Sequence, residues 1–352
     1  MALSIPVTWS DAHRLHDPES AVWVGVPIPG DELPARADAI RAALEEAGAP
    51  VVPAEPHPDD ALLAVHEAGL VEFLRGAWRD WDAAGFPADP GQGDVTGYIF
   101  PTPGLLAGYE PRVPASLAAR TGAWSYDTMT AVGPGTWEAA RGAVDAALTA
   151  ADIVLDGTRA AYACCRPPGH HVTRSAFGGS CYLNNTAIAA QYLRDRGFAR
   201  VSILDVDAHH GNGAQTIFRE RDDVLTGSVH VDPAYGWFPH FLGFAEESGE
   251  TNLNATLSPG SGDEAWLAAV DRLVAAVRRH ESEALVVALG VDAASADPNS
   301  PLEVTGAGYR EAGRRLGGLG LPTVLAQEGG YVLETVGSLV LEALQGFEEG
   351  AS

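Results

Sequence analysis

From residue 160 onward, the chain alternates short apolar segments with segments of helical periodicity. The helical segments cover residues 186–197, 263–280 and 306–320, where apolar side chains recur every three or four positions. Strands that are apolar throughout and joined by helices are typical of a parallel sheet covered on both faces. The pattern therefore predicts an α/β fold with a central, mostly parallel sheet. The predicted strands are 161–165, 201–206, 224–231, 284–290 and 322–327.

A segment of different character covers residues 83–125. It contains PADPGQGD, PTPG and YEPRVP, and such a density of proline, glycine and aspartate is typical of turns. Residues 70–78 before it and residues 136–152 after it have helical spacing. Because long loops in compact domains usually serve as lids, rims or interface arms, we expect a loop insertion here. The surrounding single domain is expected to cover residues 1–352.

Composition and charge narrow the class of protein. Of the 352 residues, 46% are hydrophobic and 20% are charged, which supports a folded core and argues against disorder. The 22 basic and 47 acidic residues give a net charge of −25, which disfavours binding to nucleic acid or to an anionic membrane. The charge is compatible with a cationic substrate, although acidic surfaces more often serve solubility.

The expected compartment is the cytoplasm. The longest apolar run, residues 284–291, is far too short to span a bilayer, and the first residues lack the pattern of a secretory signal. The three cysteines are an odd number, which fits a reducing compartment and no disulfide framework.

Chemically reactive side chains directly follow four of the predicted strands. The carboxyl ends of parallel strands lie at one edge of the sheet, where ligands bind in open α/β folds. We therefore expect these side chains to meet around one site. They are His170 and His171 after 161–165; Asp205, Asp207, His209 and His210 at the end of 201–206; Asp292 and Asp297 after 284–290; and Glu328, Gly329, Gly330 and Tyr331 after 322–327.

The sequence DVDAHH at residues 205–210 predicts a metal site. Alternation along an extended strand puts Asp207 and His209 on one face, where a carboxylate and an imidazole can hold one ion. Asp297 would complete three ligands with one position open, which is typical of a catalytic metal. This set suits zinc, and Fe(II) or Co(II) would also fit. The alternative is a salt bridge between Asp207 and His209, which leaves the distant Asp297 unexplained.

The adjacent His170 and His171 follow a rigid Pro-Pro-Gly turn and could act as general base and general acid. Asp205 is a candidate to orient one of the two imidazoles. Tyr331 follows two glycines and could donate a hydrogen bond to an oxyanion. Structural roles are the alternatives: a buried histidine for the pair, and core packing for the tyrosine.

Five segments of the chain, in order, resemble motifs of the histone deacetylase superfamily. They are CRPPGHH (165–171), FGGSCYLNN (177–185), LDVDAHHGNG (204–213), ALGVDAASADP (288–298) and EGGY (328–331). Three further segments are similar to bacterial acetylpolyamine amidohydrolases: HEAGLVEFLRGAW (66–78), PGTWEAA (134–140) and FPHFLGFAEESG (238–249). The resemblance covers nearly the whole chain and implies an arginase-like α/β domain.

The resemblance assigns roles to individual residues. It implies zinc held by Asp207, His209 and Asp297, proton transfer by His170 and His171, and carbonyl polarisation by Tyr331. It pairs His170 with Asp205 and His171 with Asn212. It also implies two potassium sites, one formed by Asp205, Asp207, His209, Ser228 and Val229, and a peripheral one near Phe218, Arg221 and Val224.

The same resemblance concerns the substrate pocket. Acetylpolyamine amidohydrolases place acidic side chains at the pocket mouth, and one such position falls at Met129 here. Ser180 stands where those enzymes have an aromatic residue, which implies a wider or less charged pocket. The other residues expected along the pocket are Phe177, Gly179, Trp237 and Phe238. An insertion at the place of residues 83–125 dimerises the polyamine-type relatives and narrows their entrance, which implies a homodimer.

These observations predict a zinc-dependent amidohydrolase that removes an acetyl or short acyl group from a primary amine. The preferred substrate is a small molecule such as an acetylpolyamine, because a narrowed entrance favours small or extended molecules. The alternative is a deacetylase of acetyl-lysine in proteins or peptides, which needs an open rim. A non-catalytic binder of acylated ligands is disfavoured, because no ligand, histidine or tyrosine is missing.

Overall fold

In the computed structural model, which describes residues 2–18 and 21–352, eight strands form a central sheet. Their order is β4-β1-β5-β10-β9-β6-β7-β8, and each neighbouring pair is parallel. The predicted parallel α/β fold is therefore confirmed. The strands are β1 Val7–Trp9, β4 Val51–Pro53, β5 Ala160–Ala163, β6 Val201–Asp205, β7 Val224–Val231, β8 Asn252–Leu257, β9 Ala284–Leu289 and β10 Thr323–Gln327.

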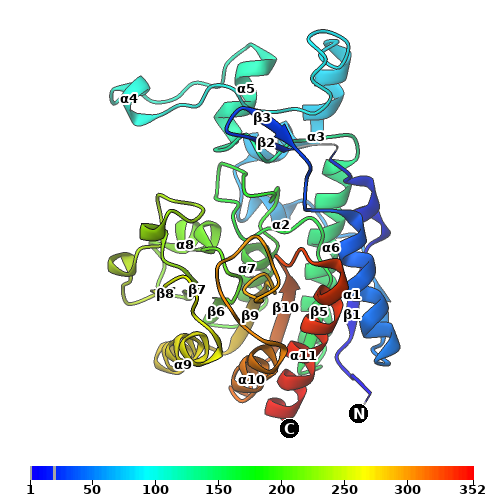
Figure 1. Cartoon of the computed structure of the whole chain (residues 1–352), viewed down its shortest axis with the longest axis vertical. Coiled ribbons are helices and arrows are strands. Elements are labelled where there is room, and N and C mark those ends of the chain that lie inside the picture. The colour runs from blue at the N-terminus through cyan, green and yellow to red at the C-terminus, as the bar shows by residue number, and fades with distance from the viewer. Residues whose placement is uncertain (1, 19–20) are drawn as a thin grey trace.

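Helices cover both faces of the sheet (Figure 1). One face carries α1 (Pro34–Glu46), α9 (Asp263–His280), α10 (Gly306–Gly317) and α11 (Leu333–Ala351). The other face carries α3 (Ala68–Ala83), α6 (Thr136–Leu155) and α7 (Asn185–Asp195). Shorter helices are α2 Asp60–Leu63, α4 Pro103–Leu106, α5 Leu117–Trp124, α8 Asn212–Phe218, η1 Asp11–Leu15, η2 Pro233–Tyr235 and η3 Ala245–Glu247.

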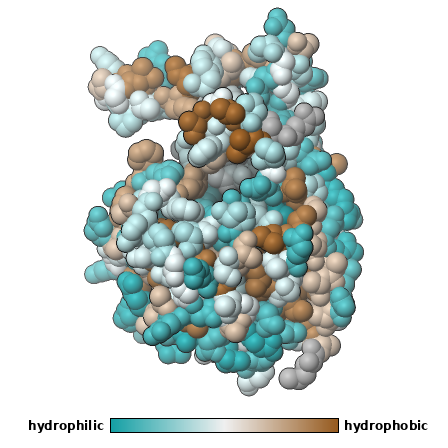
Figure 2. Space-filling model, in the orientation of Figure 1, coloured by the Kyte–Doolittle hydropathy of each residue, from teal (hydrophilic) through white to brown (hydrophobic). Residues whose placement is uncertain are grey.

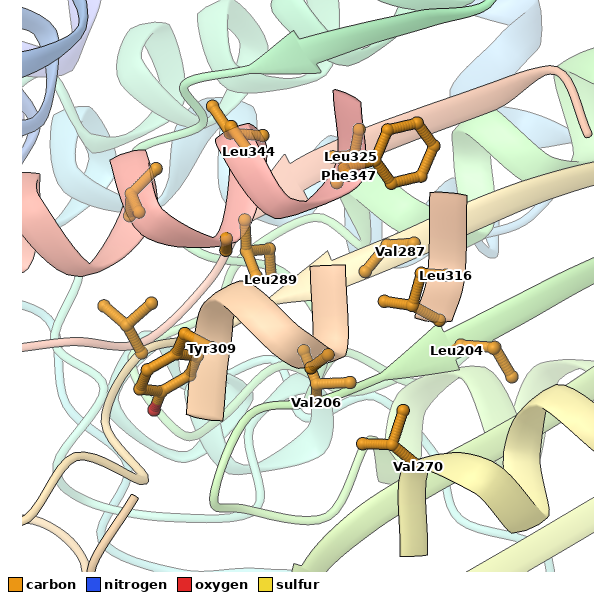
Figure 3. Packing of buried hydrophobic residues seen from close by; sticks show 14 of the residues in the cluster. Leu204, Val206, Val270, Val287, Leu289, Tyr309, Leu316, Leu325, Leu344 and Phe347 are labelled. Carbon is orange, nitrogen blue, oxygen red and sulfur yellow. The ribbon is translucent and has the colours of Figure 1, made fainter. Parts of the chain in front are cut away.

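The core is divided by the sheet into two apolar layers. Along β9, Leu285, Val287 and Leu289 contribute to one layer, whereas Ala284 and Val286 contribute to the other. This alternation follows from the two-residue period of a strand. Figure 3 shows the first layer, in which residues of β9 and β10 face Leu316 of α10 and Leu344 and Phe347 of α11.

The five strands predicted from the sequence are all present, and the structure adds three short or polar ones to the sheet. β1 and β4 have only three residues each, and β8 reads NLNATL, so none has the long apolar run that identified the others. A separate antiparallel hairpin of β2 (Ala21–Trp23) and β3 (Val26–Ile28) was also not predicted.

Residues 84–125, here named the arm, extend away from the sheet together with the β2–β3 hairpin (Figure 1). The expected continuous loop is interrupted by the short helices α4 and α5. Large apolar side chains of the arm are exposed, including Tyr109 at 82% and Leu105 at 63%. Trp23 and Val24 of the hairpin are also exposed, and Figure 2 shows apolar residues gathered on this part of the surface.

Among the described residues, none of the helices combines the length and the apolar character needed to cross a bilayer.

Candidate active site

The strands β5, β10, β9 and β6 are neighbours, so the loops that follow them meet at one edge of the sheet. A cavity of about 480 Å³ lies at this edge, and His171, His209 and Tyr331 reach its wall. The cavity brings together residues from strand ends that are separated by up to 160 positions in the sequence, as expected from the parallel topology.

The two adjacent histidines are held by different partners. His170 Nδ1 lies 2.9 Å from Asp205 Oδ2, and His171 Nδ1 lies 2.7 Å from Asn212 Oδ1. Because both acceptors engage Nδ1–H groups, each ring keeps Nε2 for other contacts. The ring centroids are 3.9 Å apart, and His171 alone of the pair lines the cavity.

The surroundings separate the pKa values of the two imidazoles. Burial alone would lower the pKa of His170, but the carboxylates of Asp207 and Asp205 face it and raise that pKa well above its usual range. Burial lowers the pKa of His171 well below its usual range, and the positive charges of His170 and His209 add to this effect. The surroundings therefore shift the two pKa values in opposite directions, with the pKa of His170 above that of His171.

One group of possible metal ligands consists of Asp207, His209 and Asp292, of which His209 lines the cavity. One ligand atom of each lies within 4.8 Å of the others, and His209 Nδ1 is 2.9 Å from Asp292 Oδ2. A Cβ atom at Gly290 or Gly329 would lie 2.0 or 2.6 Å from Asp207 Oδ2, so this carboxylate fills the space that both glycines leave. Two carboxylates and an imidazole are a donor set that fits zinc.

Asp297, the third ligand predicted from the sequence, is adjacent to this group but is not one of its three members. Its Oδ2 accepts the Tyr331 amide hydrogen at 2.7 Å, and its Oδ1 accepts that of Asn299 at 3.0 Å. Burial raises the pKa of Asp297 against these hydrogen bonds, and the negative charge of Asp207 raises it further. Asp297 itself is buried and does not line the cavity, but the next two residues, Pro298 and Asn299, do.

Tyr331 reaches the cavity from the loop after β10. The Arg36 guanidinium lies 4.5 Å from the centre of the tyrosine ring. The same guanidinium donates to the carbonyl oxygens of Gly330 at 2.5 Å and Glu328 at 2.8 Å, which holds the loop. Burial raises the pKa of Tyr331 well above its usual value, so its hydroxyl remains protonated and is able to donate a hydrogen bond.

With this geometry established, comparison with known proteins shows where the chain belongs. The Histone deacetylase domain family matches residues 31–347. The chain is a member of the histone deacetylase family. It is 40% identical over 349 residues to acetylpolyamine amidohydrolase 1 of Pseudomonas aeruginosa, with 97% of this chain and 99% of that protein covered.

Further relatives agree with this assignment to the histone deacetylase family. Acetylpolyamine amidohydrolase of Mycoplana ramosa is 40% identical over 347 residues, which cover 97% of this chain and 98% of that protein. The crystal structure of an acetylpolyamine aminohydrolase from Burkholderia pseudomallei superposes with a TM-score of 0.92 at 37% identity, covering 99% of both chains. The resemblance stated from the sequence motifs is thereby confirmed.

Most of the pocket residues predicted for this histone deacetylase family member line the cavity: Met129, Gly179, Ser180, Trp237 and Phe238. Phe177 differs, because its side chain is fully buried and stacks on Phe73 and Tyr182 at 6.1 and 5.9 Å between ring centroids. A Phe in the sequence FGGS is equally compatible with the cavity wall and with the core, so tertiary packing decides where its side chain lies.

A carboxylate near the predicted Met129 position faces inward. Asp127 accepts the amide hydrogens of Met129, Thr130 and Gly179 at 3.0, 2.8 and 2.6 Å. These bonds join two segments of the cavity wall and occupy the oxygens of Asp127. The acidic residue exposed at the cavity is instead Asp31, which lines it next to the buried Glu32.

Of the two positions implied for potassium, the first lies within the sheet and the second at its periphery. Asp205 and Ser228 are paired neighbours on β6 and β7, and both border a small void of about 10 Å³. Val229, the next residue of β7, is buried. At the peripheral position, the Arg221 guanidinium is paired with Asp223 at 2.6 Å and lies over the Phe218 ring, and Val224 begins β7.

Two residues of the centre were not assigned a role from the sequence, although both follow predicted strands. Asp292 partners His209, and burial next to Asp207 raises the pKa of Asp292 to about 7. Glu328 is fully buried and accepts the amide hydrogens of Gly169 and His170. The sequence signal for both residues was their position directly after a predicted strand. That position does not determine the direction in which the side chain points.

Proposed function

We propose that this protein is a zinc-dependent amidohydrolase that removes an acetyl or short acyl group from a primary amine of a small molecule, such as an acetylpolyamine. The observation that carries the proposal is the meeting of His171, Tyr331 and the Asp207–His209 pair at one cavity. A proton acceptor, an oxyanion donor and metal ligands are the parts that hydrolysis of an amide needs. The similarity to acetylpolyamine amidohydrolases supports the substrate class.

Zinc would be held by Asp207, His209 and Asp297. A catalytic metal must face the substrate, and Asp297 accepts hydrogen bonds from two cavity-lining residues, Tyr331 and Asn299, whereas Asp292 is fully buried. Asp292 then lies next to the ligands without holding the metal, since its Oδ2 contacts His209 Nδ1, the nitrogen that also faces Asp207. When bound, zinc would lower the pKa of the attacking water and polarise the acyl carbonyl. Iron(II) or cobalt(II) would fit the same donors.

The protein's own groups supply the remaining steps. His171, neutral and oriented by Asn212, accepts the proton of the attacking water. The Tyr331 hydroxyl donates to the oxygen that becomes negative when the carbonyl carbon is attacked. The protonated histidine pair then returns a proton to the leaving nitrogen, and Asp205 keeps His170 oriented and charged.

The substrate assignment is tested by turnover of matched acetylated compounds. We expect acetylated diamines to be hydrolysed with a higher kcat/KM than acetyl-lysine peptides, with acetylated amino sugars as a third class. Inhibition by a hydroxamate, which chelates zinc, checks that the same centre is responsible. A preference for the peptides would favour the protein-deacetylase alternative, and binding without turnover of any compound would make the protein a non-catalytic binder.

Replacing Asp31 with asparagine is expected to raise KM for a monoacetylated diamine about two- to fivefold, the size of one exposed ion pair. Asp31 is exposed at the cavity and would face the distal ammonium group of that substrate. The KM for an N-alkylacetamide of equal length, which lacks the ammonium group, should not change. Asp17→Asn is the control, because Asp17 is exposed nearby without lining the cavity. Equal effects on both compounds would contradict this role.

We also propose that the arm forms a homodimer. Its exposed Tyr109 and Leu105 lie with other apolar side chains on a part of the surface that a monomer rarely leaves uncovered. The double substitution of Tyr109 and Leu105 by glutamate is expected to halve the molar mass measured by light scattering. Tyr235→Glu, at a tyrosine of η2 that is 56% exposed outside the arm, should leave the mass unchanged. An unchanged mass in the double variant would remove the arm from the interface.

We also propose that potassium binds at the two positions described above and that the protein is cytoplasmic. The void beside Asp205 and Ser228 supports a cation site of small size. The free thiols of Cys164, Cys165 and Cys181 are all buried, which is compatible with a reducing compartment.

A further inference from the structure

Glu328 is a fully buried carboxylate that the proposed reaction leaves unused. Residues 167–171, which include the two adjacent histidines, are here named the catalytic turn. Glu328 Oε2 accepts two backbone amide hydrogens from this turn, those of Gly169 at 2.7 Å and His170 at 3.1 Å. Its Oε1 has no hydrogen-bond partner among the described residues. Burying a carboxylate that has two amide donors on one oxygen and none on the other costs free energy of folding. We therefore expect this side chain to have a specific role.

The backbone of Glu328 belongs to the loop after β10, which also carries Tyr331. Its amide donates to Leu289 at 3.0 Å, and its carbonyl accepts from Arg36 at 2.8 Å. The next amide, that of Gly329, donates to Asp207 Oδ2 at 2.8 Å, and Tyr331 lies two residues further on. Through one side chain, Glu328 thus connects the loop that carries Tyr331 with the turn that carries His170.

The catalytic turn has little other freedom. A Cβ atom at Gly169 would lie 2.4 Å from the Leu183 carbonyl oxygen and 2.6 Å from the Asn185 amide nitrogen, so the turn packs directly on the start of α7. The Glu328 carboxylate holds the turn from the other side. A small retreat of this carboxylate would release the amides of Gly169 and His170 without opening the core.

We propose that Glu328 is a positioning residue, which sets the distance between the histidine pair and Tyr331 through its hydrogen bonds to the catalytic turn. The inference rests on the deacetylase function proposed above. The role needs an acceptor oxygen at a given place and not a negative charge. In agreement, burial raises the pKa of Glu328 to about 7, so the neutral form is readily available.

Two substitutions separate geometry from charge. Glu328→Asp keeps the carboxylate but withdraws it by one carbon–carbon bond, and we expect kcat to fall about 10- to 100-fold with little change in KM, since a displacement of about 1 Å at a catalytic group costs that much. Glu328→Gln keeps an acceptor oxygen in place, and its kcat should stay within about threefold of the wild type. Zinc content and Tm should be unchanged in both variants.

Glu348→Asp is the matched control. Glu348 Oε1 also accepts two consecutive amide hydrogens, those of Ser4 at 2.5 Å and Ile5 at 3.0 Å, but it lies near the chain termini and away from the cavity. This variant should keep the wild-type kcat. Hydrogen–deuterium exchange gives an independent readout: peptides covering residues 166–172 should exchange faster in Glu328→Asp only.

The outcomes are distinct. A wild-type kcat in Glu328→Asp would overturn the inference, and an equal loss of activity in Glu328→Gln would overturn it in favour of charge. Loss of cooperative unfolding in Glu328→Asp would make Glu328 a folding residue and also overturn it. A wild-type protein without turnover of any acetylated amine is a different result, because it removes the proposed function itself.

Discussion

Asp297→Ala protein is expected to be purified nearly free of zinc and without measurable turnover. Loss of a residue that only orients a ligand costs about 10- to 100-fold in metal affinity, so loss of one of three ligands should cost more. The two carboxylate oxygens of Asp297 accept the amide hydrogens of Tyr331 and Asn299, both of which line the cavity. Elemental analysis of dialysed protein measures the zinc, and circular dichroism checks that the fold is retained.

Asp292→Asn is the matched comparison for this prediction. Asp292 belongs to one group with Asp207 and His209, and its Oδ1 also accepts the Ala208 amide hydrogen at 2.8 Å. As a residue next to the ligands that does not itself hold zinc, its replacement should weaken zinc binding by about 10- to 100-fold and leave a site that fills when zinc is in excess. Full zinc occupancy in Asp297→Ala together with an empty site in Asp292→Asn would identify Asp292 as the third ligand.

Tyr331→Phe is expected to lower kcat by about two to three orders of magnitude, the usual effect of losing one oxyanion donor. The hydroxyl stays protonated because burial raises the pKa of Tyr331 well above its usual value. The phenyl ring of the variant keeps its place over Arg36, so KM and Tm should change little. Steady-state kinetics on an acetylated diamine provide the measurement.

Tyr309→Phe controls for the loss of a buried phenol as such. Tyr309 is buried between α10 and α9, where its ring contacts Trp266 at 5.1 Å between centroids, and it does not line the cavity. The kcat of the Tyr309→Phe variant should equal that of the wild type. Unchanged kinetics in Tyr331→Phe would remove Tyr331 from the mechanism, whereas a rise in KM alone would assign it to substrate binding.

The alternation of apolar segments and helices was sufficient to predict the parallel sheet and five of its strands. Long, fully buried strands such as β7 and β9 must be apolar throughout, and that requirement is visible in the sequence. β1 and β4 could not be predicted in the same way, because three residues carry no periodicity and their pairing is decided by the rest of the sheet.

The sequence by itself also placed reactive residues at the ends of β5, β6, β9 and β10, and the parallel topology brings these strand ends to one edge. Tertiary structure decided the direction of each side chain there. It turned Asp292 toward His209, Glu328 toward the catalytic turn and Phe177 into the core. The presence of the buried strands and their parallel arrangement follow from the local apolar pattern, whereas strand order and side-chain direction depend on packing and hydrogen bonds between segments far apart in the chain, which no local pattern records.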